Sequence, residues 1–237
     1  MAEIKWGKQR IAIELHDRDV VLCESQEQAV AAAKAIASAF DVDVIDGDDD
    51  ARGTLRDRFG KRGTALIPKV LSTLQLDQDA LEWRLKDVSP LRRLLADIVR
   101  SLANDDAVLV YELATFTAMP FDLAHVYRHI NAVHAAFGVP VIVVIVDPAL
   151  ITSSGQYLTV LTADGIVESA PVAQALADPQ SEHLLTRLEA TPVPNPLAMQ
   201  QRRVQRASTR PVNYAHTQIV QLPTADAIAL AGGDITD

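Results

Sequence analysis

The chain has 237 residues, 49% hydrophobic and 22% charged, which is the composition of a globular protein with a sizeable core. Its 22 Lys and Arg against 31 Asp and Glu give a formal net charge of −9, which argues against a nucleic acid as the main partner. One cysteine, no apolar leader and no apolar run long enough for a bilayer predict a reduced, cytoplasmic protein without direct membrane insertion.

The first forty-five residues predict three short strands and one long helix. Apolar runs at residues 11–15 and 19–23 indicate two strands on either side of a polar turn. The alanine-rich run that follows contains neither Gly nor Pro, so a helix is expected over residues 25–40 with Ser25 as its N-cap. Residues 42–45 then indicate a third, short strand.

The next part of the chain is more charged, and it precedes a buried strand. Residues 47–63 are expected to form an exposed loop, and residues 65–76 and 80–85 two short helices. Proline at the first turn and leucines on one face predict a clear helix over residues 90–102. The continuous apolar run at 107–111 is typical of a strand that is buried on both faces of a parallel sheet.

The remaining elements continue the alternation of strands and helices. A helix at residues 121–137 and a second buried strand at 141–146 come first. The elements after them are strands at 157–162 and 165–168 and short helices at 171–177 and 182–188. This alternation predicts an α/β fold with a mainly parallel sheet flanked by helices. We expect one domain over residues 1–191 and a partly irregular, arginine-containing extension over 192–237.

Three phrases in the second half of the chain resemble those of an ABC-transporter ATPase domain. RSLANDDAVLVYE resembles the signature helix that runs into the Walker B strand, and PVIVVIVDPAL resembles the strand before the H-loop. The C-terminal segment of the family's domain, most closely that of its peptide-importer branch, is resembled by YLTVLTADGIVESAPVAQALADPQSEHLLTRLEATP. The resemblance implies an ABC-ATPase-like fold whose helical subdomain, within residues 47–88, is reduced.

The residues that handle ATP in that family are largely absent from this chain. A phosphate loop needs GxxxxGK[ST], because backbone groups and a lysine must approach the phosphates closely. The matching stretch, residues 23–30, lacks both glycines, the lysine and the hydroxyl at their places, and residues 88–92 keep only the serine of the signature LSGGQ. Tyr111 replaces the Mg²⁺-binding aspartate, and Val146 replaces the H-loop histidine. We therefore expect no ATP hydrolysis and no cofactor, with ATP and Mg²⁺ bound only if the degenerate site retains affinity.

The resemblance leaves four candidate site residues. Glu112 matches the glutamate that polarises water and is the catalytic candidate, with a solvated strand end as the alternative. Trp6 lies where the family places an aromatic ring against adenine, which makes it the candidate for nucleotide binding. Glu24 and Glu27 lie where phosphate would bind, and their charges predict a surface for a partner that presents basic groups.

Two other groups of residues are candidate metal sites. Asp122, His125 and His129 share one helical face, and histidines four residues apart can chelate zinc. A polar helix surface is the favoured explanation, because no further cluster of strong ligands accompanies them. The acidic run 46–50 lacks the bidentate glutamate of a calcium loop. The expectation is therefore that there is no metal site.

The leading interpretation is an ABC-ATPase-like protein that has lost its hydrolysis motifs and acts as a non-catalytic subunit of a transport complex. Its partner would be another ABC ATPase subunit or a membrane permease, and it would lie peripherally on the inner face of the membrane. The alternative is a free-standing regulatory or scaffolding protein that uses the fold as a binding surface. A third interpretation, an enzyme of unrelated chemistry, depends only on Glu112 and the histidines.

Overall fold

The computed structural model describes residues 2–47, 52–61, 63–116 and 120–191. The chain separates into two units, residues 1–192 and 193–237, and the described residues all belong to the first. The expected extension, 192–237, lies outside the described residues and stays a prediction.

A six-stranded sheet forms the centre of the first unit, in the order β4-β5-β6-β3-β7-β8. All neighbouring strands are parallel except β7 and β8, which are antiparallel. The strands are β3 (Arg18–Cys23), β4 (Val44–Ile45), β5 (Leu109–Glu112), β6 (Val141–Ile145), β7 (Tyr157–Thr162) and β8 (Gly165–Pro171). Strands β5, β6 and β3 are neighbours and almost wholly buried, which confirms the prediction made from their continuous apolar runs.

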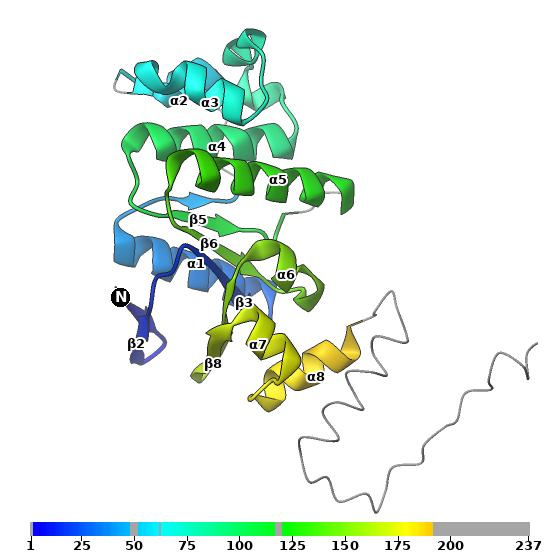
Figure 1. The fold of residues 1–237 in the computed structure, drawn as a ribbon. Helices are drawn as coiled ribbons and strands as arrows, with labels where there is room; N and C mark the ends of the chain where they lie inside the picture. Colours follow the sequence, from blue (N-terminus) through cyan, green and yellow to red (C-terminus); the bar gives the residue numbers. More distant parts are fainter. Residues whose placement is uncertain (1, 48–51, 62, 117–119, 192–237) are drawn as a thin grey trace, which may run out of the picture. The chain divides into compact units, whose positions relative to one another are not determined.

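Helices cover both faces of this sheet (Figure 1). Helix α1 (Gln26–Phe40) packs on one face through its small buried alanines and Ile36. Its N-cap is Ser25, as predicted, because the side chain accepts a hydrogen bond from the Gln28 amide. Helices α4 (Pro90–Asn104) and α5 (Pro120–Phe137) cover the other face. The predicted mainly parallel sheet with flanking helices is therefore confirmed.

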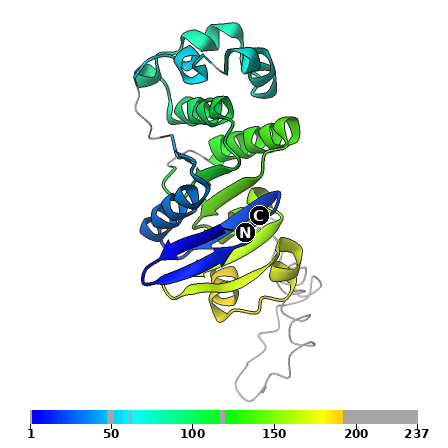
Figure 2. The same cartoon turned by 90° about the vertical axis from the view of Figure 1, so that its left-hand side faces the viewer.

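A separate two-stranded sheet lies on the α1 side of the molecule (Figure 2). It pairs β1 (Ala2–Trp6) with β2 (Gln9–Ile13) in antiparallel register. The alternation in β1 buries Ile4 and Trp6 and exposes the residues between them. Because β2 pairs with β1 and not with β3, the two strands predicted on either side of the polar turn belong to different sheets.

Short helices fill the part of the chain before α4. They are α2 (Leu55–Phe59), α3 (Ile67–Thr73) and 3₁₀ turns at Gly63–Leu66, Gln78–Glu82 and Leu85–Asp87. The expectation of an exposed loop over residues 47–63 is wrong where α2 lies. Thr54 and Asp57 form a capping box, and Leu55 and Phe59, four residues apart, are buried against the core.

Three more α-helices and one 3₁₀ turn complete the described chain: the turn Pro148–Leu150, α6 (Ile151–Ser154), α7 (Val172–Ala177) and α8 (Glu182–Ala190). The buried carboxylate of Glu168 fixes the start of α8, because it accepts hydrogen bonds from the backbone amides of Gln180 and Ser181. No described helix combines the length and apolar character needed to cross a lipid bilayer.

Candidate functional site

The connection between β3 and α1 consists of two residues, Glu24 and Ser25. The eight residues that the family resemblance matches to the phosphate loop are therefore the end of a strand, this short turn and the first turn of the helix. A phosphate loop of the form GxxxxGK[ST] wraps its backbone N–H groups around phosphate between the strand and the helix. Two residues are too few to form such a cradle.

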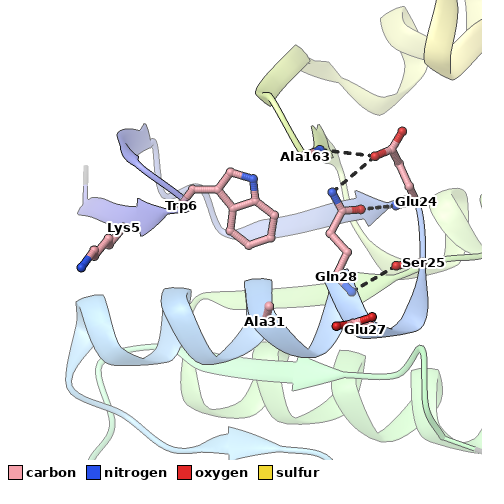
Figure 3. Close-up of a pocket in the computed structure, with 9 residues that line it drawn as sticks. Lys5, Trp6, Glu24, Ser25, Glu27, Gln28, Ala31 and Ala163 are labelled. Carbon is pink, nitrogen blue, oxygen red and sulfur yellow. Dashed lines mark hydrogen bonds between the residues drawn. The ribbon is translucent and has the colours of Figure 1, made fainter.

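An open pocket of about 510 Å³ lies beside this turn (Figure 3). Its lining comes from the end of β1, the first turns of α1 and the turn between β7 and β8. The lining residues are Lys5, Trp6, Gly7, Glu24, Ser25, Glu27, Gln28, Ala31 and Ala163. The structure thus brings Trp6, Glu24 and Glu27 together. Their assignment to nucleotide and partner binding stays a prediction.

Trp6 forms a fixed wall of this pocket. Only 9% of the residue is exposed, and its indole N–H donates to the Thr162 carbonyl oxygen at 2.8 Å. In Figure 3 the ring extends from β1 toward Gln28, while the Lys5 ammonium points away from it. The indole orientation is therefore set by the protein and needs no ligand.

The two glutamates of the pocket differ in their contacts. Glu24 Oε2 accepts from the Ala163 amide at 3.3 Å, and its Oε1 lies 3.3 Å from His183 Nδ1. The Glu24 amide donates to Gln28 Oε1, which closes the turn on itself. The Glu27 carboxylate, by contrast, makes no hydrogen bond or ion pair with the described residues. Glu24 therefore stabilises the turn between β3 and α1 through these contacts. Glu27 is the more available of the two for binding a partner.

Glu112 is not among the residues that line this pocket. It is 2% exposed, and its carboxylate accepts from the Ala114 amide at 2.7 Å and from the Thr115 amide at 3.1 Å. The Thr115 hydroxyl also donates to it. These bonds fold the loop after β5 back onto the strand, and Gln26 at the start of α1 holds the same loop through the Ala114 carbonyl. The geometry gives Glu112 a structural role, and the catalytic assignment stays untested.

The other positions matched to ATP motifs are packing or capping residues. Tyr111 is fully buried, and its hydroxyl has no hydrogen-bond partner among the described residues. Burial raises its pKa. Ser89, the surviving signature serine, is the N-cap of α4 and accepts from the Arg92 amide. Neither side chain is presented to the pocket.

Arg187, which none of the sequence patterns indicates, lies at the carboxyl ends of the central strands. Its guanidinium donates to the backbone carbonyls of Cys23 and Val146, the residues that follow directly on the paired Leu22 and Ile145. Burial lowers the pKa of Arg187, and burial raises the pKa of the Cys23 thiol to about 12. No sequence pattern marks this contact, because its acceptors are backbone atoms 164 and 41 residues away.

The predicted helical face with histidines is only partly described. His125 is exposed and His129 half-buried, and burial and the neighbouring His125 lower the pKa of His129. The Asp122 side chain lies outside the described residues, as do residues 48–50 of the acidic run. Within the described chain, no three His, Cys, Asp or Glu side chains cluster as metal ligands.

Comparisons with known proteins show which solved structures have a similar fold. No protein-family model matches the chain. The methionine import ATP-binding protein MetN of Cutibacterium acnes is 34% identical over 85 residues, which span 36% of this chain but only 23% of that protein. The structure is similar to CbiO1 from Clostridium perfringens, described as part of the ABC transporter complex CbiONQ, with a TM-score of 0.60 and 9% identity, covering 88% of this chain and 96% of that one.

Two further cassettes give the same result. A nucleotide-free ATP-binding cassette from an ABC transporter superposes with a TM-score of 0.55 at 12% identity, over 78% of this chain and 96% of that chain. The bacterial cassette MJ0796, described as dimeric, gives 0.54 at 11% identity, over 72% and 95%. The chain has the fold of an ABC-transporter ATPase domain.

Proposed function

We propose that this protein is a non-catalytic, ABC-ATPase-like subunit of a transport complex. The observation that carries the proposal is the two-residue turn between β3 and α1. In a phosphate-binding fold this turn is the part that contacts the nucleotide, and here Glu24, Ser25 and Gln28 close it by hydrogen bonds among themselves. The fold is kept, and the element that would bind phosphate is too short to do so.

Electrostatics support the same conclusion. Glu24 and Glu27 line the pocket beside the helix start, where a nucleotide would bring its phosphates. Two like charges about 4 Å apart repel by about 1 kcal/mol even in water, and by more where solvent is partly excluded. The positive end of α1 offsets this only in part, because Glu27 already lies in its first turn and the Ser25 side chain accepts from the Gln28 amide. ATP should therefore bind weakly.

A binding experiment tests this part of the proposal. Isothermal calorimetry with Mg-ATP should show an affinity weaker than millimolar, and phosphate release should not exceed that of a protein-free blank. Micromolar binding of Mg-ATP would overturn the proposal, since the short turn would then have to be compatible with a phosphate site.

The partner we propose is an intact ABC ATPase subunit or a membrane permease, which would hold the chain at the inner face of the membrane. CbiO1 is described as part of a transporter complex and MetN as an import ATP-binding protein, and these descriptions support a partner of the same class. A symmetric sandwich of two copies would place Glu27 against a second copy without intervening Mg²⁺, so like charges would oppose it. We therefore expect a different subunit with basic groups.

Co-purification from native membranes tests the partner. The full chain should bring down an ABC subunit or permease, and Glu27→Lys should weaken that association. Glu14→Lys is the matched control, because Glu14 is also exposed and the substitution changes the net charge equally. Glu24→Lys is a poorer variant than the sequence suggests, because Glu24 bonds Ala163 and lies against His183. Recovery of a lone monomer would favour the free-standing regulator, and equal binding by Glu27→Lys would refute the role of charge.

A further inference from the structure

Positive charge gathers in one part of this acidic chain. Residues 52–100 contain eleven of the 22 Lys and Arg but only six of the 31 Asp and Glu. Residues 157–191, by contrast, contain five acids and one base, Arg187. Charge asymmetry of this kind within one chain is typical of proteins that bind a membrane or a nucleic acid. The positive part is therefore a candidate binding surface.

Three of its bases, Arg84, Lys86 and Arg92, form a basic patch beside the half-buried ring of Trp83. Trp83 and Arg84 belong to an extended segment that is bridged to Thr54, directly before α2. The Arg92 guanidinium, from the first turn of α4, lies 4.4 Å from the centre of the Trp83 ring. Lys86 lies in the 3₁₀ turn between them, and all three basic side chains are exposed.

The position of Arg92 is electrostatically unfavourable within the protein itself. It is the third residue of α4, and the first turn of that helix carries no acid. The positive end of the helix dipole repels a cation at this place, where an acid would be favoured. A negatively charged surface in front of the helix start would remove this repulsion.

A flat anionic surface fits this charge distribution better than a nucleic acid does. In Figure 1, α2, α3 and α4 lie at one end of the first unit, and β8, α7 and α8 lie at the other. The six-stranded sheet lies between them, and its strand spacing of about 4.8 Å puts β4 about 24 Å from β8. This exceeds the Debye length of about 8 Å in physiological salt. A plane that touches the basic end therefore hardly repels the acidic end, whereas a long polyanion can reach both.

We propose that the basic patch docks the protein directly on the anionic headgroups of a lipid bilayer, without insertion. Each Lys or Arg near such a surface adds to the attraction, and the acidic end turns away, so one orientation is preferred. Trp83 suits this place, because an indole has an apolar body and a polar edge and is common at headgroup level. The proposal goes beyond the transport role and does not rest on it, since the lipid itself is the partner.

Vesicle sedimentation with the full-length protein tests the docking. The protein should sediment with vesicles that contain phosphatidylglycerol and stay in solution with pure phosphatidylcholine, at about 0.1 M salt, where the Debye length is about 10 Å. Salt at about 1 M should release it, because the Debye length falls to about 3 Å. Equal binding to both kinds of vesicle, or binding to neither, refutes the docking.

Two triple variants locate the surface that binds. Replacing the three bases of the basic patch by glutamine should weaken binding to the anionic vesicles by about 100-fold, which is about fivefold for each base. The matched control removes three exposed bases from the β1–β2 turn, β2 and α1, and should bind like the wild type: Lys8→Gln, Arg10→Gln and Lys34→Gln. Circular dichroism shows whether both variants are folded. Unchanged binding by the patch variant, or an equal loss in both variants, refutes the role of the patch.

Tryptophan fluorescence tests the orientation, and it serves even if the patch variant does not fold. The chain has two tryptophans, so Trp6→Phe leaves only Trp83, and Trp83→Phe leaves only Trp6. With enough anionic lipid to bind all the protein, headgroup spin labels should quench Trp83 and leave Trp6 unquenched. The reverse pattern would show docking by another face and overturn the proposal. Duplex DNA or polyglutamate that displaces the protein from the vesicles at equal charge concentration would also overturn it, because the patch would then bind polyanions in general.

Discussion

The hydroxyl of Tyr111 offers a direct test of the core. It is fully buried at the end of β5, among apolar side chains that include Leu109 and Leu113, and has no hydrogen-bond partner in the described chain. An unpaired buried polar group costs about 1–3 kcal/mol, and Tyr111→Phe removes that group with little change of shape. We expect the variant to be more stable by about 1 kcal/mol, which for a domain of this size raises the melting temperature by about 2–4 °C.

The same substitution at a second site provides the control. The Tyr127 hydroxyl accepts a hydrogen bond from Ser154 Oγ at 2.9 Å, so Tyr127→Phe should lower stability by about 1 kcal/mol. Tyr111→Asp, which restores the acid that the family has at this position, should destabilise by several kcal/mol because it buries a charge and leaves a cavity. Urea unfolding followed by circular dichroism measures all three. A Tyr111→Phe variant less stable than wild type would show that the hydroxyl is hydrogen-bonded and would refute the reasoning.

Three further predictions concern the site and its surroundings. Glu112→Gln should lower the free energy of unfolding by about 1–2 kcal/mol, since an amide replaces the carboxylate that holds the loop; any change in ATP turnover would instead make Glu112 catalytic. Because the pKa of His129 is lowered on folding, its neutral ring contributes stability that is present above a pH of about 6.5 and lost on acidification. The urea midpoint should therefore fall less between pH 7 and pH 5 in His129→Gln than in wild type, and equal falls would contradict this. Trp6→Phe should cost about 1 kcal/mol by leaving the Thr162 carbonyl unpaired, and an unchanged thermal melt would show that this bond contributes nothing.

Sequence patterns predicted the elements whose apolar residues follow one period without interruption. The strands β5 and β6 and the helices α1 and α4 belong to this group, and Ser25 was identifiable as an N-cap by its type and place. Among the elements that the patterns did not predict, β1 and α2 have clear local reasons. In β1 the apolar positions are only Ile4 and Trp6, and in α2 two buried residues are surrounded by charge.

The candidate site was less predictable than the fold. Trp6, Glu24 and Glu27 share a pocket, yet the residues alone gave no reason to group them, because β1 and α1 meet only through tertiary packing. The family resemblance supplied that grouping. It could not supply Arg187, whose partners are backbone carbonyls, or the hydrogen bonds by which Glu112 holds the loop after β5. A backbone carbonyl can accept a hydrogen bond whatever side chain its residue carries, so the type of the accepting residue does not indicate such a contact.

The short turn between β3 and α1 also bears on how such a protein could change over time. A lysine or a glycine can be introduced by one substitution, but a stretch of backbone cannot. Forming a phosphate loop here would require an insertion of several residues between Cys23 and Gln28, together with release of the hydrogen bonds that close the turn. An insertion of that length has a modest entropic cost by itself, so the barrier lies in the number of simultaneous changes. Single substitutions alone cannot add the backbone that a phosphate loop would need in this turn.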